Sequence, residues 1–173
     1  MINEYALQKL SYGMYIIVSG DETKYNGQIC NTAFQITSDP KVVAISINKD
    51  NFTNECIKKA GKFTMSILDT TATLLFIGKF GFRSGRTDDK LTGVQCKTGV
   101  TGIPIVLENT CSYLECEVVN ETDLGTHILY FGKVVEGDIL TETTPLTYDY
   151  YHKVIKGKSP KSAPTYIAPQ KQA

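Results

Sequence analysis

Short apolar runs rich in β-branched and aromatic residues recur along this chain and predict β-strands. Six runs fit this description, at residues 13–19, 28–33, 41–47, 63–68, 113–119 and 127–135. In the fifth run Leu114, Cys116 and Val118 alternate with Glu115 and Glu117, which places the two sets on opposite faces of a strand. Several strands joined by turns, with little helix between them, predict a mainly β, antiparallel barrel or sandwich.

Turn-forming residues lie between these runs. Residues 20–27 contain several of them and end on Asn26-Gly27, a pair that predicts a tight hairpin when apolar runs flank it. A second turn is expected at residues 120–125. Near the start of the chain, residues 4–10 predict a helical turn.

Helical periodicity appears in two further segments. Residues 53–60 predict a short helix that Asn51 or Thr53 caps and Gly61 ends. The second helix is expected over about residues 71–79, with Gly81 ending it and with a buried side formed by Leu74, Leu75 and Ile77. Both helices are therefore insertions in a β protein.

The length and composition of the chain favour one domain. At 173 residues, with 42% hydrophobic and 21% charged residues, the chain is long enough for one well-buried core and short for two. We place this domain at residues 1–155 and a Pro- and Lys-rich extension at residues 156–173. Two interpretations of the extension stay open: it packs across a surface and covers a ligand or a neighbouring subunit, or it is a solvated end.

Charge and cysteine usage exclude several classes of function. The 18 basic and 18 acidic residues cancel, so the chain lacks the net positive charge that attracts nucleic acid or an anionic membrane. No targeting pattern or long apolar run is present in the sequence, and we expect a cytoplasmic protein. Five cysteines without a Cys-x-x-Cys pair, and only two histidines, argue against a disulfide framework and against a metal centre.

Two loop-like segments, residues 46–53 and 80–90, carry groups suited to hold an anion. The second segment has closely spaced glycines, which let backbone N–H groups converge on a negative charge, together with arginine, serine and lysine. The first segment leads from a strand into a helix, whose N-terminal N–H groups and Thr53 hydroxyl can face the same anion. Neither segment matches a P-loop or a dinucleotide-binding Gly-x-Gly-x-x-Gly motif, so a phosphate-bearing cofactor held in another way stays open.

Several motifs in a fixed order support a family resemblance; they lie at residues 26–35, 38–40, 43–53, 80–90, 127 and 158–166. Together they resemble the flavin reductase-like FMN-binding split-barrel proteins, most closely the branch with flavoredoxins and the flavin domain fused to rubredoxin in anaerobes. The resemblance spans nearly the whole chain. It implies a six-stranded Greek-key split barrel with a few flanking helices, usually a homodimer, that binds FMN non-covalently near the subunit interface.

The resemblance also implies a set of cofactor-binding residues. The FMN phosphate and ribityl chain would be held by Asn48, Lys49, Thr53, Ser84, Gly85 and Lys90. The isoalloxazine ring would be lined, mostly through backbone, by Asn31, Thr32, Phe34 and Gln35, and the set is completed by Ser46, Phe82 and Arg83. Lys49 is also compatible with a solvated turn position, and Arg83 and Arg86 with solvation or with pairing to Asp88 and Asp89.

Three functions stay open. The first is reduction of FMN by NADH or NADPH, for which the two cofactors carry the hydride chemistry, so we nominate no catalytic residue. The second is an FMN electron carrier that serves a protein partner such as a rubredoxin or a flavodiiron protein. The third is a flavin-free association module. His127 is compatible with a structural role or with contact to the flavin or the nicotinamide.

Overall fold

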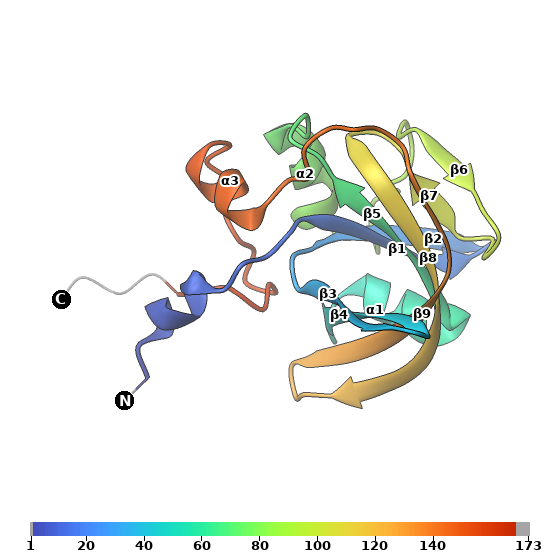
Figure 1. Cartoon of the computed structure of the whole chain (residues 1–173), viewed down its shortest axis with the longest axis horizontal. Helices are drawn as coiled ribbons and strands as arrows, with labels where there is room; N and C mark the ends of the chain where they lie inside the picture. The colour runs from blue at the N-terminus through green and yellow to red at the C-terminus, as the bar shows by residue number, and fades with distance from the viewer. Residues whose placement is uncertain (1, 169–173) are drawn as a thin grey trace.

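The computed structural model describes residues 2–168 and shows a curved antiparallel sheet with helices around it (Figure 1). Its strands are β1 (Tyr15–Asp21), β2 (Lys24–Cys30), β3 (Ala33–Ser38), β4 (Lys41–Asn48), β5 (Lys62–Leu68), β6 (Cys96–Thr98), β7 (Pro104–Val106), β8 (Thr110–Asp123) and β9 (His127–Ile139). Its helices are the 3-10 helix η1 (Glu4–Lys9) and the α-helices α1 (Phe52–Ala60), α2 (Leu74–Gly81) and α3 (Tyr148–Lys153).

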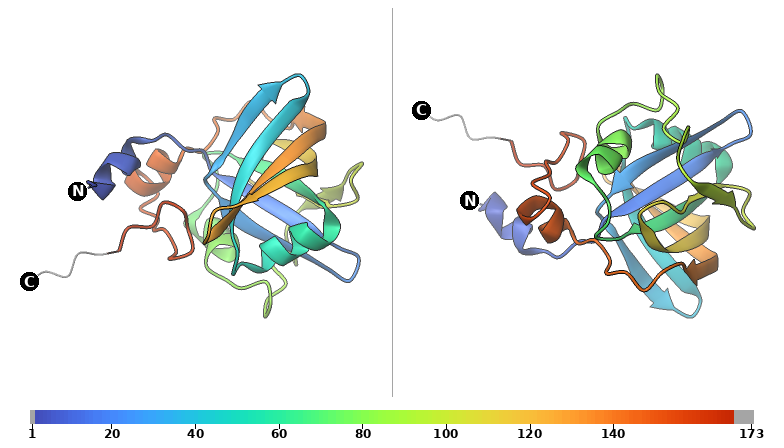
Figure 2. Two further views of the ribbon diagram at one scale, coloured as in Figure 1. Left: turned by 90° about the horizontal axis from the view of Figure 1, so that it is seen from below. Right: turned by 90° about the horizontal axis from the view of Figure 1, so that it is seen from above.

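The main sheet has seven strands in the order β2-β1-β5-β8-β9-β4-β3, and β6 pairs with β7 in a separate ribbon. All pairs in the main sheet are antiparallel, and the long strands β8 and β9 bend around the middle of the barrel (Figure 2). The expected mainly β antiparallel fold with few helices is confirmed. No helix within residues 2–168 is both long and apolar enough to cross a membrane.

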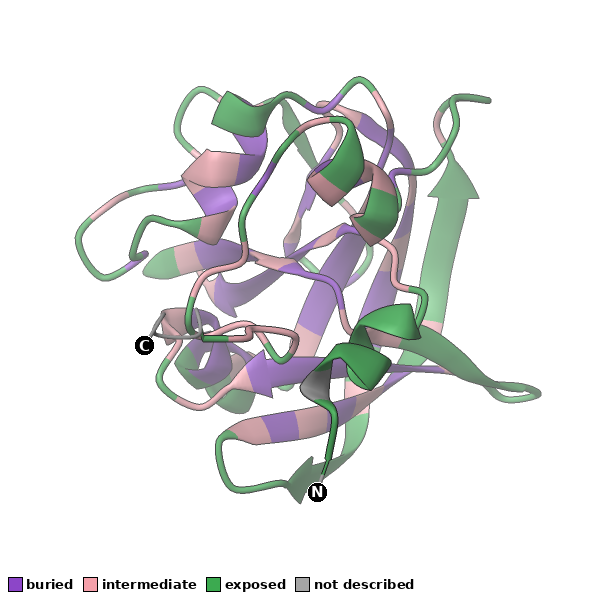
Figure 3. Cartoon of the chain, turned by 90° about the vertical axis from the view of Figure 1, so that its left-hand side faces the viewer, coloured by how far each residue is buried: buried purple, intermediate pink, exposed green. Residues whose placement is uncertain are grey.

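The middle of the sheet is buried (Figure 3), and it carries two cores, one that includes residues of α2 and one that includes Ile57 of α1. Because successive side chains of a strand point to opposite faces, Ile16 and Val18 of β1 pack into one core and Ile17 packs into another. The first core includes Phe76 and Phe80 of α2. The second core lies inside the barrel, and its largest members are Ile45, Ile47, Phe63 and Tyr130.

The hairpin predicted at Asn26-Gly27 is wrong. Both residues lie inside β2, where Asn26 pairs with Ser19 and Gly27 with Val18. The turn instead joins Asp21 to Lys24 and is held by the Thr23 N–H, which donates to Asp21 Oδ1 at 3.0 Å. Tertiary packing explains why position 27 is a glycine, because a Cβ at this position would lie 2.9 Å from the Phe80 ring.

The turn expected at residues 120–125 lies later than predicted. β8 continues to Asp123, and the turn into β9 contains Gly125 at φ +87°, a conformation that glycine adopts without strain. Residues 33–38 form β3 at the edge of the sheet, whereas the predicted strand ended at residue 33 and residues 34–38 carried no strand prediction. The sequence did not predict this strand because most of β3 is exposed, so apolar and polar residues do not alternate regularly along it.

Two predictions about helices need correction. In α2 the predicted buried side is only partly right, because Leu74 and Leu75 are exposed and the helix buries Phe76, Ile77 and Phe80. Thr73 caps this helix by accepting the Phe76 N–H, so the helix begins later than expected and turns a different face inward. Residues 148–153, which precede the extension and carried no helix prediction, form α3, a short helix whose Tyr151 is buried. Residues 169–173 of the extension lie outside the described residues.

Candidate functional site

A cavity of about 300 Å³ opens between the end of the barrel, α1, the loop after α2 and the C-terminal segment. This volume lies at the lower end of the range of small-molecule sites. Met14, Ile29, Ile77 and Phe80 form an apolar wall. Polar residues of β2, of the start of α1 and of the loop at residues 82–90 line the rest. We call this cavity the pocket.

The N-terminus of α1 faces the pocket without a side-chain cap. Asn51 occupies the N-cap position, but its side chain makes no capping hydrogen bond. Its Nδ2 instead donates to Gln28 Oε1 of β2 at 3.1 Å. The N–H groups of the first helical turn therefore lack the usual side-chain acceptor. A nine-residue helix with this arrangement attracts an anion at its N-terminus.

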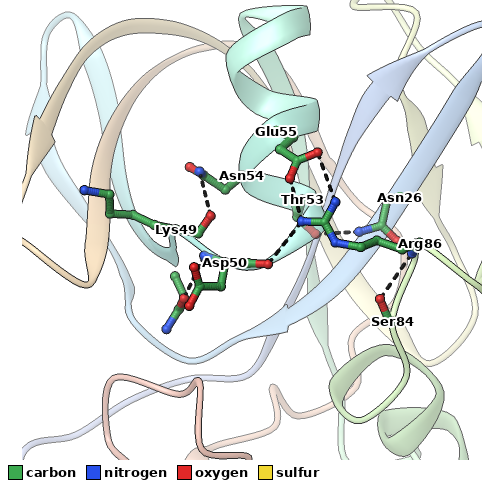
Figure 4. A network of polar contacts seen from close by, with 9 residues as sticks. Asn26, Lys49, Asp50, Thr53, Asn54, Glu55, Ser84 and Arg86 are labelled. Carbon is green, nitrogen blue, oxygen red and sulfur yellow. Dashed lines mark hydrogen bonds and ion pairs between the residues drawn. The ribbon is translucent and has the colours of Figure 1, made fainter.

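A second contact between β2 and α1 involves Asn26 and Thr53, which are both buried. Asn26 Nδ2 donates to Thr53 Oγ1 at 2.7 Å (Figure 4). Asn26 Oδ1 has no hydrogen-bond partner, and within residues 2–168 it is the one buried side-chain polar atom in this state. The loop approaches this atom so closely that a Cβ at Gly85 would lie 1.9 Å from it. Only glycine fits at position 85 without displacing the loop or the amide.

The loop at residues 82–90 is fastened to α1 by Arg86. Its guanidinium donates to both carboxylate oxygens of Glu55, at 2.5 and 3.1 Å, and to the Asp50 carbonyl at 3.3 Å (Figure 4). It also lies 5.3 Å from the centroid of the Phe52 ring, a cation–π contact. The pairing of Arg86 with Asp88 or Asp89 that the sequence left open is therefore not made. The bidentate pair lowers the pKa of Glu55 and joins the two predicted loop segments.

Lys90 supplies a buried positive charge to the pocket. Its side chain is 4% exposed, and its Nζ donates to the Phe80 carbonyl at 3.1 Å. No acidic group of the described chain lies within ion-pair distance of this ammonium group. Burial lowers the pKa of Lys90 to about 8, because the charged form loses its hydration. A buried cation without a counter-ion is costly, and an anionic ligand would remove that cost.

Most of the residues proposed from the sequence come together in the pocket. The structure places nine of them in its lining: Asn31, Ser46, Asn48, Thr53, Phe82, Arg83, Ser84, Gly85 and Lys90. Four others are not part of this lining: Thr32, Phe34, Gln35 and Lys49.

Lys49 points away from the pocket. Its Nζ forms an ion pair with Asp123 Oδ2 at 2.6 Å, at the tip of the β8–β9 hairpin (Figure 4 shows the direction of the side chain). Phe34 and Gln35 line a different cavity, which opens beside the second core on the same sheet face as Tyr15 and Leu114. Sequence order alone could not show which of these residues line the pocket, because alternate residues of a strand face opposite sides.

Several lining residues carried no prediction. Gln28 and Asn51 tie β2 to α1, and Asn26 was interpreted as a turn residue. The C-terminal segment adds Lys158, Ser159, Pro160, Ser162, Ala163 and Pro164. The motif at residues 158–166 was the sequence signal for these residues. Of the two interpretations of the extension, the structure favours a segment that packs across a surface.

The chain is similar to known proteins of one family. The sequence model of the flavin reductase like domain matches residues 7–155, which is most of the chain. The chain belongs to the flavin reductase-like domain family. It is 42% identical over 162 residues to a ferric-chelate reductase (NAD(P)H) of Archaeoglobus fulgidus, covering 94% of this chain and 96% of that protein. It is 44% identical over 161 residues to the high molecular weight rubredoxin of Moorella thermoacetica, covering 93% of this chain and 70% of that protein.

Solved structures of the family agree with this assignment. The flavin reductase PheA2 superposes with a TM-score of 0.71 at 25% identity, covering 85% of this chain and 93% of that chain. The nitrilotriacetate monooxygenase component B of Mycobacterium thermoresistibile superposes with a TM-score of 0.73 at 25% identity, covering 82% of this chain and 76% of that chain. The family membership confirms the resemblance inferred from the motifs.

Proposed function

We propose that this protein is a flavin reductase that binds FMN in the pocket and is reduced by NADH or NADPH. The observation that carries the proposal is the buried ammonium of Lys90, which lines the same cavity as the uncapped N-terminus of α1. A phosphate dianion satisfies both, since it supplies the missing counter-ion and accepts from free N–H groups. Homology supports the same reading, because the relatives named above include NAD(P)H-dependent and flavin reductases.

The residues present fit FMN at both ends. The phosphate end offers Lys90, the Thr53 hydroxyl and the loop around Gly85, which only glycine allows to approach. The apolar wall of Met14, Ile77 and Phe80 offers a dry surface for an aromatic ring. FMN carries a phosphate and an apolar aromatic ring in one molecule. A free nucleoside phosphate or a neutral aromatic compound matches the two ends of the pocket less well.

The protein contributes binding and orientation to the reaction. A bound flavin would supply the two-electron chemistry of hydride transfer from a nicotinamide. Lys90 and the α1 N-terminus fix one end of the cofactor, and the Arg86–Glu55 pair keeps the loop closed on that end. The C-terminal segment narrows access of water to the pocket. None of these roles needs a general acid or base.

A second candidate is an FMN electron carrier that passes electrons to a protein. The similarity to a protein named high molecular weight rubredoxin favours this candidate. The chain covers 70% of that relative, so the relative has further sequence outside the match. A rubredoxin-like partner would then receive electrons from the same pocket without direct oxidation of a nicotinamide.

We also propose a homodimer that forms through the open side of the barrel, on the sheet face that carries the second core. This face holds a second cavity, and at its edge Phe34 has 55% of its surface exposed. Tyr15, Ile67 and Leu114 belong to the same apolar face. A second copy would cover it and explain why Phe34 and Gln35 lie outside the pocket of their own chain. Sedimentation of the FMN-loaded protein would reveal a monomer if this is wrong.

The deciding experiment is an anaerobic spectral titration. After incubation with FMN and removal of free flavin, the preparation should be yellow, and NADH or NADPH should bleach the flavin absorbance. Bleaching by a reduced electron-transfer protein, with no response to NADH or NADPH, would instead support the carrier. A preparation that stays colourless would contradict both candidates and leave the association module. Ferric chelate and rubredoxin should each be offered as oxidants, since the two relatives are named for different activities.

A further inference from the structure

The charges of this neutral chain are distributed unevenly along it. Residues 150–168 contain no Asp or Glu but hold Lys153, Lys156, Lys158 and Lys161, which are all exposed. We call these four lysines the basic face. By contrast, the exposed charged residues in the outer parts of β8 and β9 are mostly acidic and include Glu117, Glu121, Glu136 and Asp138. The protein therefore has one basic surface and one acidic surface.

Most of the basic face has no partner in the chain. Lys153 forms an ion pair with Asp149 at 2.8 Å, but both side chains are well exposed, so the pair contributes little. Within residues 2–168, Lys156, Lys158 and Lys161 form no ion pair. Like charges placed this close along the chain repel one another, and an acidic partner would remove that repulsion.

The basic face lies at the mouth of the pocket. Lys158 lines the pocket, and Lys161 lies between the lining residues Pro160 and Ser162. The support of these lysines is ordered, because the Tyr151 hydroxyl of α3 donates to the Lys158 carbonyl at 2.9 Å. The loop at residues 82–90 adds the exposed Arg83 to the same lining, where Asp50 is the one acidic residue among those described.

Exposed apolar side chains lie beside the basic face. The chain that follows η1 pairs with the start of α3, where the Tyr148 N–H donates to the Tyr12 carbonyl at 2.9 Å and the two rings meet edge to face. Figures 1 and 2 show η1 and α3 on the same side of the barrel. Tyr5 and Leu7 of η1, and Leu10 after it, are exposed. Apolar contacts beside a polar rim are typical of protein interfaces.

We propose that the basic face and the apolar residues of η1 form the docking surface for a small acidic electron-transfer protein. The proposal rests on the proposed function, because a redox cofactor in the pocket is what such a partner would serve. Two oxidised partners would dock in turn, each accepting one electron from the reduced flavin, which releases its two protons to water. The basic face attracts the partner and the acidic strands repel it, so the charge pattern orients the encounter.

Binding of an acidic rubredoxin to the full chain tests the proposal. Isothermal titration would be done at about 0.01 M and about 1 M salt, where the Debye length is about 30 Å and about 3 Å. The same rubredoxin with its carboxylates amidated is the control probe. We expect the acidic probe to bind at least about tenfold more tightly at the lower salt concentration, and more tightly than the control. Equal affinities of the two probes, or salt-independent binding, would overturn the proposal.

Matched lysine variants test the location of the surface. Lys156→Gln combined with Lys161→Gln removes two charges of the basic face, and neither residue lines the pocket. Lys58→Gln combined with Lys133→Gln removes two exposed lysines of α1 and β9. We expect affinity for the acidic probe at low salt to fall about five- to tenfold in the first variant and less than about twofold in the second. Equal losses would mean that net charge alone matters and would overturn the proposal.

Leu7→Gln tests the apolar part of the surface, with Leu75→Gln as the control because Leu75 is exposed on α2. Salt does not screen apolar burial, so Leu7→Gln should weaken binding about threefold at both salt concentrations. Leu75→Gln should bind as the wild type does. An unchanged affinity in Leu7→Gln would contradict docking over η1.

Flavin absorbance of the same samples separates this proposal from the proposed function. A colourless protein that binds the acidic probe with the expected salt dependence would refute the proposed function and retain the docking surface. A yellow protein that NADH bleaches but that lacks this binding would refute the surface alone. Vesicles of anionic phospholipid are the last probe, since lysines beside apolar residues also suit a membrane. Vesicle binding without rubredoxin binding would overturn the proposal in favour of a membrane.

Discussion

The two ends of the pocket differ in how the chain satisfies its own polar groups. At the loop end, Lys90 has no counter-ion, Asn26 Oδ1 has no donor and the α1 N-terminus has no side-chain cap. At the opposite end, the Ser162 carbonyl of the C-terminal segment already accepts from Asn48 of the pocket lining and from His127 beside it. Groups left unsatisfied gain by binding a ligand, whereas satisfied groups must first lose a partner. Affinity should therefore come from the loop end, and exchange should be controlled at the end that the C-terminal segment covers.

The largest effect is expected from Lys90→Met, which removes the buried cation. We expect FMN affinity to fall about 100-fold, because a charge-assisted bond to phosphate contributes about 2–3 kcal/mol. The flavin-free variant should be at least as stable as the wild type, since an unpaired buried charge is lost. Fluorescence titration of FMN and thermal unfolding measure the two quantities.

Lys49→Met is the matched control for Lys90→Met. Lys49 is paired with Asp123 outside the pocket, so FMN affinity should change less than about threefold. Equal losses in the two variants would contradict the assignment of the phosphate to the Lys90 end.

Gly85→Ala should be the next most severe change. The new Cβ meets Asn26 Oδ1, so either the loop or the amide must move, and we expect about a tenfold loss of FMN affinity together with a destabilisation of about 1–3 kcal/mol. Gly78→Ala in α2 is the control, because its Cβ would meet no atom closer than 3.9 Å. Isothermal titration and denaturant unfolding would show whether the loss is specific to position 85.

The pH dependence of FMN binding gives a third test. The pKa of Lys90 is lowered to about 8 without ligand, and a bound phosphate raises it, so FMN affinity should fall as pH rises above about 8. The unfolded chain binds the Lys90 proton more tightly than the folded chain does. Lys90 therefore lowers the free energy of unfolding below pH 8, and this penalty disappears as pH rises from 8 to the usual range of lysine pKa values. Titrations at pH 7 to 10 should show the decline in the wild type and not in Lys90→Met.

The smallest effect is expected from the Arg86–Glu55 pair, since both side chains are about half exposed. Arg86→Leu and Glu55→Gln should each weaken FMN binding about two- to threefold, because water and salt screen such pairs. The double variant should lose no more than either single variant, which would show that the two residues act together. Additive losses would mean that Arg86 touches the ligand itself.

The sequence predicted the β architecture and the meeting of the two loop segments because both depend on local signals. Apolar runs rich in β-branched and aromatic residues marked β1, β5, β8 and β9, and the glycines and charges of residues 80–90 marked the loop. Local signals failed where distant packing decides the outcome. The Asn26-Gly27 pair is typical of a turn, but both residues lie in the middle of β2. There Gly27 packs against the Phe80 ring and Asn26 donates to the Thr53 hydroxyl.

Side-chain direction was the second source of error. Lys49 lies one residue from Asn48, but the chain turns there and sends the two side chains to different surfaces. Spacing also does not show that the Glu115 carboxylate is buried and accepts hydrogen bonds from the Val100 and Thr101 N–H groups. The burial of a charged residue depends on partners far along the chain, which spacing does not reveal.

The central claim is that the loop end of the pocket holds a phosphate, and a comparison of FMN with riboflavin tests it most directly. The two flavins share the ring and the ribityl chain and differ in the phosphate alone. We predict that the wild type binds FMN about 100-fold more tightly than riboflavin, and that Lys90→Met binds the two flavins with similar affinity. Equal affinities of the wild-type protein for FMN and riboflavin would contradict the account.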